Sequence, residues 1–314
     1  AGLPRILGET INWIFGIGTE SPETFALMAR VWATLAIVIA VTLTWIQNYG
    51  VLERAQTVIV GLLLVSVGLS CVASNPAWID ALVGTVVPSV PEYQSWIVDK
   101  YPEIALRPQW VEIAVYLGAI GGGTYDYVGY ISFLREKKWG ALAANRRSGS
   151  PAADEDASNV LKIDSDPENI SRGLRWLLAP KIDIGVSFLC VLFFTGCFVI
   201  LGAAVLHPEQ LIPSGRTLLT HQAQFLTRLH PGLLYLYQIG VFMAFWGTIY
   251  GAYEIYVRTG YECIVPLSRR LRQTPIRKVR SIVLLYCGIG GLILLWTVDN
   301  PIQLVTPAAI VGGV

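Results

Sequence analysis

The sequence predicts an all-α integral membrane protein. Of its 314 residues, 54% are hydrophobic and 14% are charged, whereas a soluble domain has about 45–50% apolar and about 25% charged residues. Several stretches each supply the about 20 mostly apolar residues that a helix needs to cross a hydrocarbon core of about 30 Å. Because lipid offers the backbone no hydrogen-bond partners, such stretches cross the bilayer as helices.

The predicted spans account for most of the apolar sequence. They are residues 25–46, 55–73, 111–134, 184–206, 231–253 and 281–298, with 301–314 as the beginning of a further span. The opening stretch 3–17 has the composition of the end of an earlier span. Residue 1 is not Met and the last residues form an uncharged apolar run, so we expect a piece of a longer protein that forms a single transmembrane domain.

Basic residues between the spans predict the orientation of the chain in the membrane. The connection 135–181 contains nine Lys and Arg residues and the connection 254–280 contains seven, whereas 74–110 and 207–230 contain two each. Cytoplasmic loops are enriched in Lys and Arg. The two basic connections are therefore predicted to be cytoplasmic, and the span 25–46 to run from outside to inside.

The cytoplasmic connection 135–180 has two parts of different composition. Residues 148–159 are small, acidic and polar, which predicts a flexible linker. The segment 168–183 is predicted to form a short helix on the membrane surface, because apolar residues recur at helical spacing with arginines between them. A partner-binding helix is the alternative for this segment. Asp183 is expected to lie at the N-terminus of the next span and to cap it.

Composition and motifs exclude several classes of function. The net charge of +1 gives no basis for nucleic-acid binding. The five cysteines form no CxxC pair and no cluster with zinc-ligand spacing. Nucleotide-binding, zinc-protease and serine-hydrolase motifs are absent from the sequence. We therefore expect neither an enzyme nor a resident cofactor, and the lipid bilayer is the predicted surrounding.

The third span contains a break signal next to an ionisable residue. Gly121–Gly123 lie near its midpoint, and each glycine costs about 1 kcal/mol relative to Ala inside a helix. A helix that unwinds there exposes backbone carbonyls at the end of its first half, while Thr124 can cap the second half. Asp126 places a carboxylate at membrane depth, where ionisable side chains face a cavity or a partner. Secondary transporters hold ions and substrates at such discontinuous helices.

A substrate site is predicted around this break. We expect it to contain Gly122, Gly123, Thr124, Tyr125 and Asp126, with Thr124 and Asp126 as oxygen ligands of a metal ion. The simpler interpretation is that the glycines let a neighbouring helix approach closely and that Asp126 pairs with an Arg or Lys.

A second ionisable residue follows a long apolar run. Glu254 comes directly after 23 uncharged residues, and Arg258 lies four positions later on the same helical face. This spacing predicts an ion pair at the membrane interface. The alternative is that Glu254 lies on a path for protons or ions.

Several segments are similar to those of one transporter family. They are LGETINWIFGI (7–17), NYGVLERAQTVIVGLLL (48–64), VYLGAIGGGTYDYVGY (115–130), TGCFVILGAAVL (195–206) and GVFMAFWGTIYGAYE (240–254). In this order they resemble the end of helix three and parts of helices five to eight of the Nramp divalent-metal transporters. The resemblance implies a LeuT-type fold of two inverted five-helix repeats, of which the chain would cover helix three to the start of helix ten.

The resemblance also implies a metal site, with an important difference. Gly118 and Ala119 match the Gly-Ala pair of the family's helix six, so the Ala119 carbonyl is implied as a metal ligand. Gly122, Gly123 and Thr124 stand where the family has Met-Pro-His. Without the Met thioether, oxygen ligands and a hard ion such as Mg²⁺ are favoured over Mn²⁺ or Fe²⁺.

The resulting hypothesis is a secondary transporter that moves a divalent cation across the plasma membrane by alternating access, with protons as a candidate coupling partner. The first alternative is an organic substrate such as an amino acid, whose carboxylate would fit the helix N-terminus at Thr124 but would be repelled by Asp126. The second is a non-transporting receptor or scaffold of the same fold. It is supported by the altered helix-six motif and by residues 306–308, which contain no Gln where the family's helix ten supplies one.

Overall fold

The computed structural model of the chain describes residues 2–46, 50–87, 92–106, 108–110, 124–136, 167–213, 217–264, 267 and 276–298. Within these ranges the chain forms helices and turns and contains no strand. Five of the helices are long and apolar enough to cross a membrane. The chain is therefore an all-α membrane protein, in agreement with its composition.

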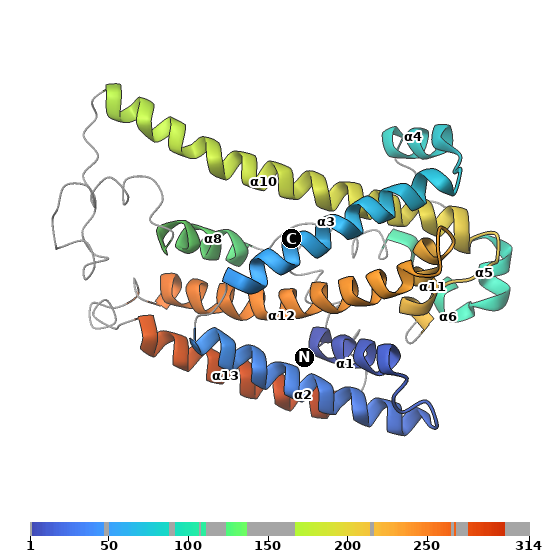
Figure 1. Cartoon of the computed structure of the whole chain (residues 1–314), viewed down its shortest axis with the longest axis horizontal. Helices are drawn as coiled ribbons and strands as arrows, with labels where there is room; N and C mark the ends of the chain where they lie inside the picture. Colours follow the sequence, from blue (N-terminus) through green and yellow to red (C-terminus); the bar gives the residue numbers. More distant parts are fainter. Residues whose placement is uncertain are drawn as a thin grey trace. The chain divides into compact units, whose positions relative to one another are not determined.

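Figure 1 shows the helices along the chain. They are α1 (Gly2–Phe15), α2 (Pro22–Ile46), α3 (Gly50–Ala73), α4 (Trp78–Val86), α5 (Ser95–Lys100), α6 (Pro102–Ala105), α8 (Thr124–Glu136), α10 (Pro167–Leu201), the π-helical turn η2 (Gly202–Leu206), α11 (Thr217–Thr227), α12 (Leu233–Ile264) and α13 (Ile276–Thr297).

The long apolar helices coincide with predicted spans. The candidate spans lie in α2, in α3, in α10 with η2, in α12 and in α13, and they overlap the predicted segments 25–46, 55–73, 184–206, 231–253 and 281–298. Of the predicted span 111–134, only the part in α8 belongs to the described residues. The predicted beginning of a further span at 301–314 lies outside them.

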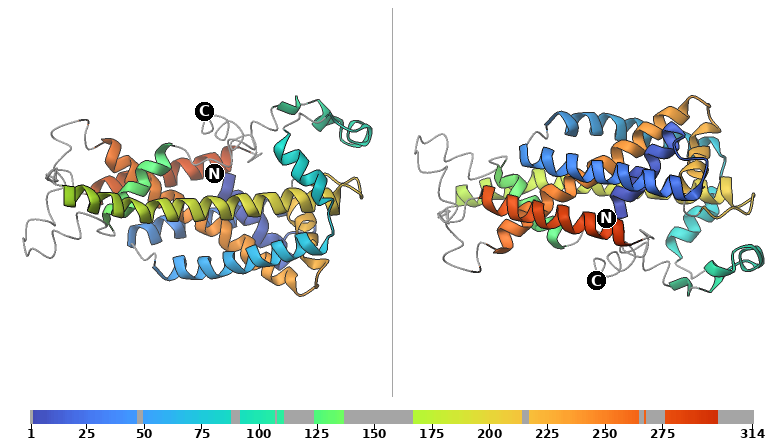
Figure 2. Two further views of the ribbon diagram at one scale, coloured as in Figure 1. Left: turned by 90° about the horizontal axis from the view of Figure 1, so that it is seen from above. Right: turned by 90° about the horizontal axis from the view of Figure 1, so that it is seen from below.

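α10 differs from the prediction. A separate surface helix was expected at 168–183, before the span 184–206, but Pro167–Leu201 form one helix, which the left view of Figure 2 shows as one ribbon. Pro180 lies inside this helix. A proline removes one helical hydrogen bond, but membrane helices tolerate it where the residues on both sides favour the helix. Asp183 therefore lies in the middle of α10 and is not its N-terminal cap.

α12 also exceeds its predicted span. The prediction ended at Tyr253, where the uncharged run ends, whereas α12 continues to Ile264. Glu254 and Arg258 consequently lie inside the helix and both are buried. A charged side chain ends an apolar run in the sequence, but it does not end a helix when it finds a partner of opposite charge one turn away.

The chain divides into two compact units, which are described separately. The first contains Ala1–Gly122, Leu192–Tyr253 and Tyr286–Val314, and the second contains Gly123–Val191 and Glu254–Leu285. Helices α10, α12 and α13 each contribute residues to both units.

The first unit begins with the helical hairpin of α1 and α2, which lie side by side in Figure 1. The Asn12 side chain donates a hydrogen bond to the Phe25 carbonyl over 2.8 Å. Gly8 lies directly against α2, where a Cβ atom would overlap the Ala29 carbonyl. The turn contains Gly16 and Gly18 with φ angles of 64° and 70°, a conformation that favours glycine.

An apolar core joins the other parts of the first unit. Side chains from α3, from the end of α10 with η2, from α11 and from α12 form one buried cluster. Leu201 and Leu226 have no exposed surface, and Tyr237 is almost completely buried. Phe198 and Phe225 meet edge to face with ring centroids 5.5 Å apart, a favourable arrangement for aromatic pairs.

The second unit contains α8, the first part of α10, the end of α12 and the start of α13. Two glycines bring its helices close together. A Cβ atom at Gly129 of α8 would lie 3.0 Å from Ile255 and 3.3 Å from Thr259 on α12. A Cβ atom at Gly260 of α12 would lie 3.0 Å from Val283 on α13. Small residues permit this close packing where helices meet.

Candidate functional site

The predicted substrate site belongs only in part to the described residues. Ala119 and Gly121–Gly123 lie outside them, and with them the predicted break of the third span. Thr124 is the first residue of α8, Tyr125 is the second, and Asp126 lies in its first turn. The Asp126 side chain is partly buried.

Asp126 lies on the face of α8 that packs against the rest of the second unit. Gly129, Tyr130 and Phe133 follow it by three, four and seven residues, and residues with this spacing share one helical face. Gly129 packs against α12, as described above, and the contacts of Tyr130 and Phe133 are described below. Tyr127 is 56% exposed. Asp126 therefore lies on the side of α8 that carries these contacts, and Tyr127 lies on the exposed side.

The first of these contacts joins α8 to α10. The Tyr130 hydroxyl donates a hydrogen bond of 2.8 Å to the carboxylate of Asp183. An ionised acceptor makes such a hydrogen bond stronger than one between neutral groups. Asp183, which the sequence suggested as a helix cap, therefore fixes the position of α8 relative to the first part of α10.

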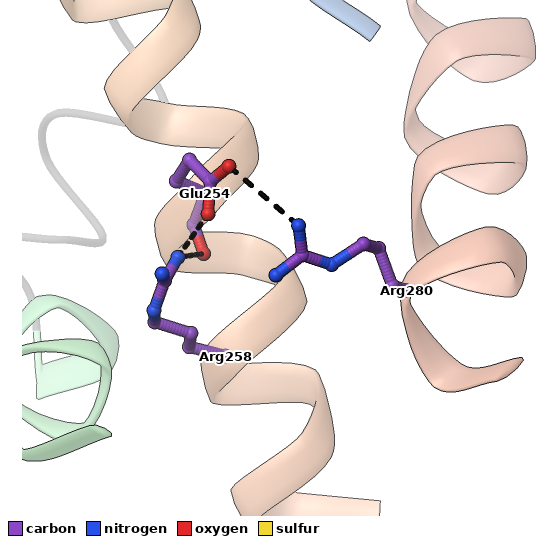
Figure 3. Close-up of polar contacts among 3 residues, drawn as sticks. All are labelled: Glu254, Arg258 and Arg280. Atoms are coloured by element: carbon purple, nitrogen blue, oxygen red, sulfur yellow. Dashed lines mark hydrogen bonds and ion pairs between the residues drawn. The ribbon is translucent and has the colours of Figure 1, made fainter. Parts of the chain in front are cut away.

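The second contact involves a buried group of charges on α12 and α13, shown in Figure 3. Glu254, Arg258 and Arg280 are 3%, 5% and 4% exposed. Arg258 Nη1 forms an ion pair with the Glu254 carboxylate and donates a hydrogen bond of 3.1 Å to the Glu254 carbonyl. Arg280 reaches from α13 toward the other carboxylate oxygen, with 3.9 Å between Nη1 and Oε1. The Glu254 carboxylate therefore connects the two helices.

Arg258 also connects this buried charge group to α8. Its guanidinium carbon lies 3.8 Å from the centroid of the Phe133 ring. A cation over an aromatic face contributes about 0.5–2 kcal/mol, with the larger values where the pair is removed from water. Phe133 and Gly129 thus hold α8 on α12, and Tyr130 holds it on α10.

The sequence found part of this arrangement. It predicted the pairing of Glu254 with Arg258, because the two are four residues apart, and the two side chains do form a buried ion pair. It missed Arg280, which is one of seven basic residues in its connection and carries no local signal. It also missed the bond between Tyr130 and Asp183, which are 53 residues apart.

The charges suit this site to positioning helices. In the part of the chain that the structure describes, no three His, Cys, Asp or Glu side chains lie close enough to hold a metal ion together. The two arginines beside Glu254 balance its negative charge and repel a passing cation. Glu254 is therefore a poor candidate ligand for a cation. No family model, curated protein or solved structure matches the chain.

Proposed function

We propose that this protein is a secondary transporter that moves a divalent cation across the membrane, with Asp126 as a ligand of the cation. The observation that carries the proposal is the position of Asp126 on the packed face of α8, in a protein with five helices that can cross a membrane. A carboxylate in such a position is costly unless it binds a partner or serves a transported ion. Thr124, two residues earlier in the sequence, would supply a second oxygen ligand.

The proposed cargo is a hard cation such as Mg²⁺. Carboxylate, hydroxyl and backbone carbonyl oxygens suit Mg²⁺, whereas soft thioether or thiolate ligands favour transition metals. Thr124 and Asp126 supply only oxygen, as would the carbonyl of Ala119. We therefore expect Mn²⁺ to compete with Mg²⁺ for the site no more strongly than Ca²⁺ does.

The buried charge group has a supporting part in this proposal. Arg258 contacts Phe133 of α8 and Glu254, and Glu254 in turn contacts Arg280 of α13. These contacts fix the helix that carries Asp126. We assign Glu254 to positioning in preference to a proton or ion path, because two guanidinium groups adjoin its carboxylate.

The proposal is tested with the full-length protein in proteoliposomes. Uptake and binding of Mg²⁺, Mn²⁺ and Ca²⁺ are measured for the wild type, for Asp126→Asn and for Asp183→Asn. Both variants lose one carboxylate charge in the second unit, but only the first loses the proposed ligand. We expect Asp126→Asn to weaken Mg²⁺ binding at least about tenfold, because loss of even a second-layer group weakens metal binding about 10–100-fold.

The control variant defines the contrary outcome. Asp183→Asn should retain Mg²⁺ affinity, because Asp183 binds Tyr130 and not the ion. Equal Mg²⁺ binding and uptake by the wild type and by folded Asp126→Asn would contradict the proposal. Absence of binding of all three ions by the folded wild-type protein would also contradict it.

A further inference from the structure

The length of α10 exceeds what a membrane crossing needs. Its apolar part with η2 comprises Ile170–Leu206, which is 37 residues, or about 55 Å at about 1.5 Å per residue. A helix that lies along the membrane normal crosses a hydrocarbon core of about 30 Å with about 20 residues. A helix tilted by about 40° from the normal needs about 26 residues. If the crossing segment ends at Leu206, the 26 residues of a tilted crossing begin at Lys181. We refer to Pro167–Pro180, which lie beyond that point, as the α10 arm.

The α10 arm is amphipathic, and its apolar side is uncovered. Four large apolar residues share one face of the helix and are between 52% and 64% exposed: Ile170, Leu174, Leu177 and Leu178. Asp183, which binds Tyr130 of α8, lies nine residues after Leu174 and therefore on the opposite face. The side of the arm that carries these four residues therefore points away from α8. Exposed apolar surface of this kind marks an interaction site.

The charges beside the apolar face indicate which surface it meets. The arm contains Arg172 and Arg175 against one acidic residue, Glu168, and Lys181 directly follows it. Glu168 forms an exposed ion pair of 2.6 Å with Arg172. The arm therefore has a net positive charge at the end of the span that the distribution of basic residues assigns to the cytoplasm. Anionic lipids give that side of a membrane its negative surface potential.

We propose that the α10 arm docks on the anionic cytoplasmic surface of the membrane. Ile170, Leu174, Leu177 and Leu178 enter the boundary between headgroups and acyl chains, while Arg172 and Arg175 bind lipid phosphates. Lipid is favoured over a second copy of the chain because the apolar face continues beyond Lys181 into the exposed apolar surface of the span, at Ile184 and Phe188, and because the flanking charges are basic. Amphipathic helices of this composition bind at such interfaces.

Pro180 supplies the hinge that docking requires. It lies in α10 between the arm and the crossing segment that begins near Lys181. Because proline donates no helical hydrogen bond and its ring crowds the preceding turn, the helix bends there more easily than elsewhere. A bend at this position turns the arm from the direction of the span toward the membrane plane. The inference depends on the membrane location of the chain and not on its cargo.

Spin labels on opposite faces of the arm test the proposal in the full-length protein. Cys190, Cys263 and Cys287 are replaced by Ala, and one label is placed at Leu177→Cys or, as the matched control, at Glu168→Cys. These positions are nine residues apart and therefore face opposite sides of the helix. We measure how accessible each label is to oxygen, which concentrates in lipid, and to a water-soluble nickel chelate. The vesicles consist of phosphatidylcholine with or without phosphatidylglycerol.

With phosphatidylglycerol, we expect the label at 177 to gain oxygen accessibility and lose nickel accessibility, while the label at 168 stays accessible to nickel. In phosphatidylcholine alone, both labels should be accessible to nickel. Equal nickel accessibility of the label at 177 in the two lipids would overturn the proposal. Protection that disappears when the protein is diluted into excess lipid would also overturn it, because it would identify a second copy of the chain as the occupant.

Charge variants with a matched control complete the test. Arg172→Gln combined with Arg175→Gln should lower the ratio of docked to undocked arm by about fivefold per arginine, the factor that about 1 kcal/mol per basic residue represents. Arg277→Gln combined with Lys278→Gln removes the same charge from exposed positions of α13 and should leave docking unchanged. Pro180→Ala should reduce docking while the arm stays helical. Equal effects of the two double variants would overturn the assignment of lipid contacts to the arm.

Discussion

The two units of the chain are stabilised by different interactions. In the first unit Leu201, Leu226 and Tyr237 are buried among other apolar side chains. In the second unit Glu254 and Arg258 are equally buried but carry opposite charges. An apolar core loses contacts roughly in proportion to the atoms removed, whereas a buried ion pair that loses one partner leaves an uncompensated charge. Single substitutions in the buried charge group should therefore lower the stability of the protein strongly. Simultaneous apolar replacement of all three charged residues should lower it less.

The largest effect is expected for Glu254→Gln. The substitution keeps the size of the side chain but leaves two buried guanidinium groups without their carboxylate, and breaking a buried pair in this way costs about 3–5 kcal/mol. The melting temperature of the purified protein in detergent should fall accordingly. Arg258→Met should approach this loss, since Arg258 also contacts Phe133. Arg280→Met should lose less, because its contact with Glu254 spans 3.9 Å.

Replacement of the complete buried charge group separates electrostatics from packing. A triple variant with Glu254→Leu, Arg258→Met and Arg280→Met removes every charge of the group and keeps similar volumes. Apolar replacement of buried ion pairs is often neutral or stabilising, so the triple variant should melt close to the wild type. A triple variant less stable than Glu254→Gln would contradict the distinction between the two units.

The apolar core of the first unit should show a smaller and position-dependent effect. Leu226→Ala removes a completely buried side chain of α11, which costs about 2–5 kcal/mol through lost transfer energy and the cavity that remains. Leu218, on the same helix, is 38% exposed, so Leu218→Ala should cost much less. Comparable losses in thermal unfolding for the two variants would show that burial on α11 does not determine stability.

The contrast between the units also explains what the sequence could predict. Lipid requires about 20 apolar residues per crossing, so α2 and α3 could be located from composition alone. The pairing of Glu254 with Arg258 followed from helical periodicity. Arg280 and Asp183 meet their partners through tertiary packing, and local sequence carries no record of which helices become neighbours.

Helix ends were less predictable for a related reason. The charge at Glu254 suggested the end of a span, and Asp183 suggested the division between a surface helix and a span. Both lie inside continuous helices, α12 and α10. Composition predicts which residues can lie in lipid. A helix can continue beyond them, as long as its backbone hydrogen bonds are formed and its charged side chains have partners.

An exposed ion pair in the first unit sharpens the comparison. Arg228 and Glu209 lie 2.8 Å apart, but their side chains are 51% and 46% exposed. Water and salt screen such a pair, so Arg228→Gln should cost only about 0.2–1 kcal/mol, and the loss should vanish at about 1 M salt, where the Debye length is about 3 Å. Arg258→Gln in the second unit should stay destabilising at the same salt concentration, because its site excludes water and ions. Thermal unfolding of both variants at low and high salt measures the difference, and an equal salt response would show that burial does not set the strength of these charges.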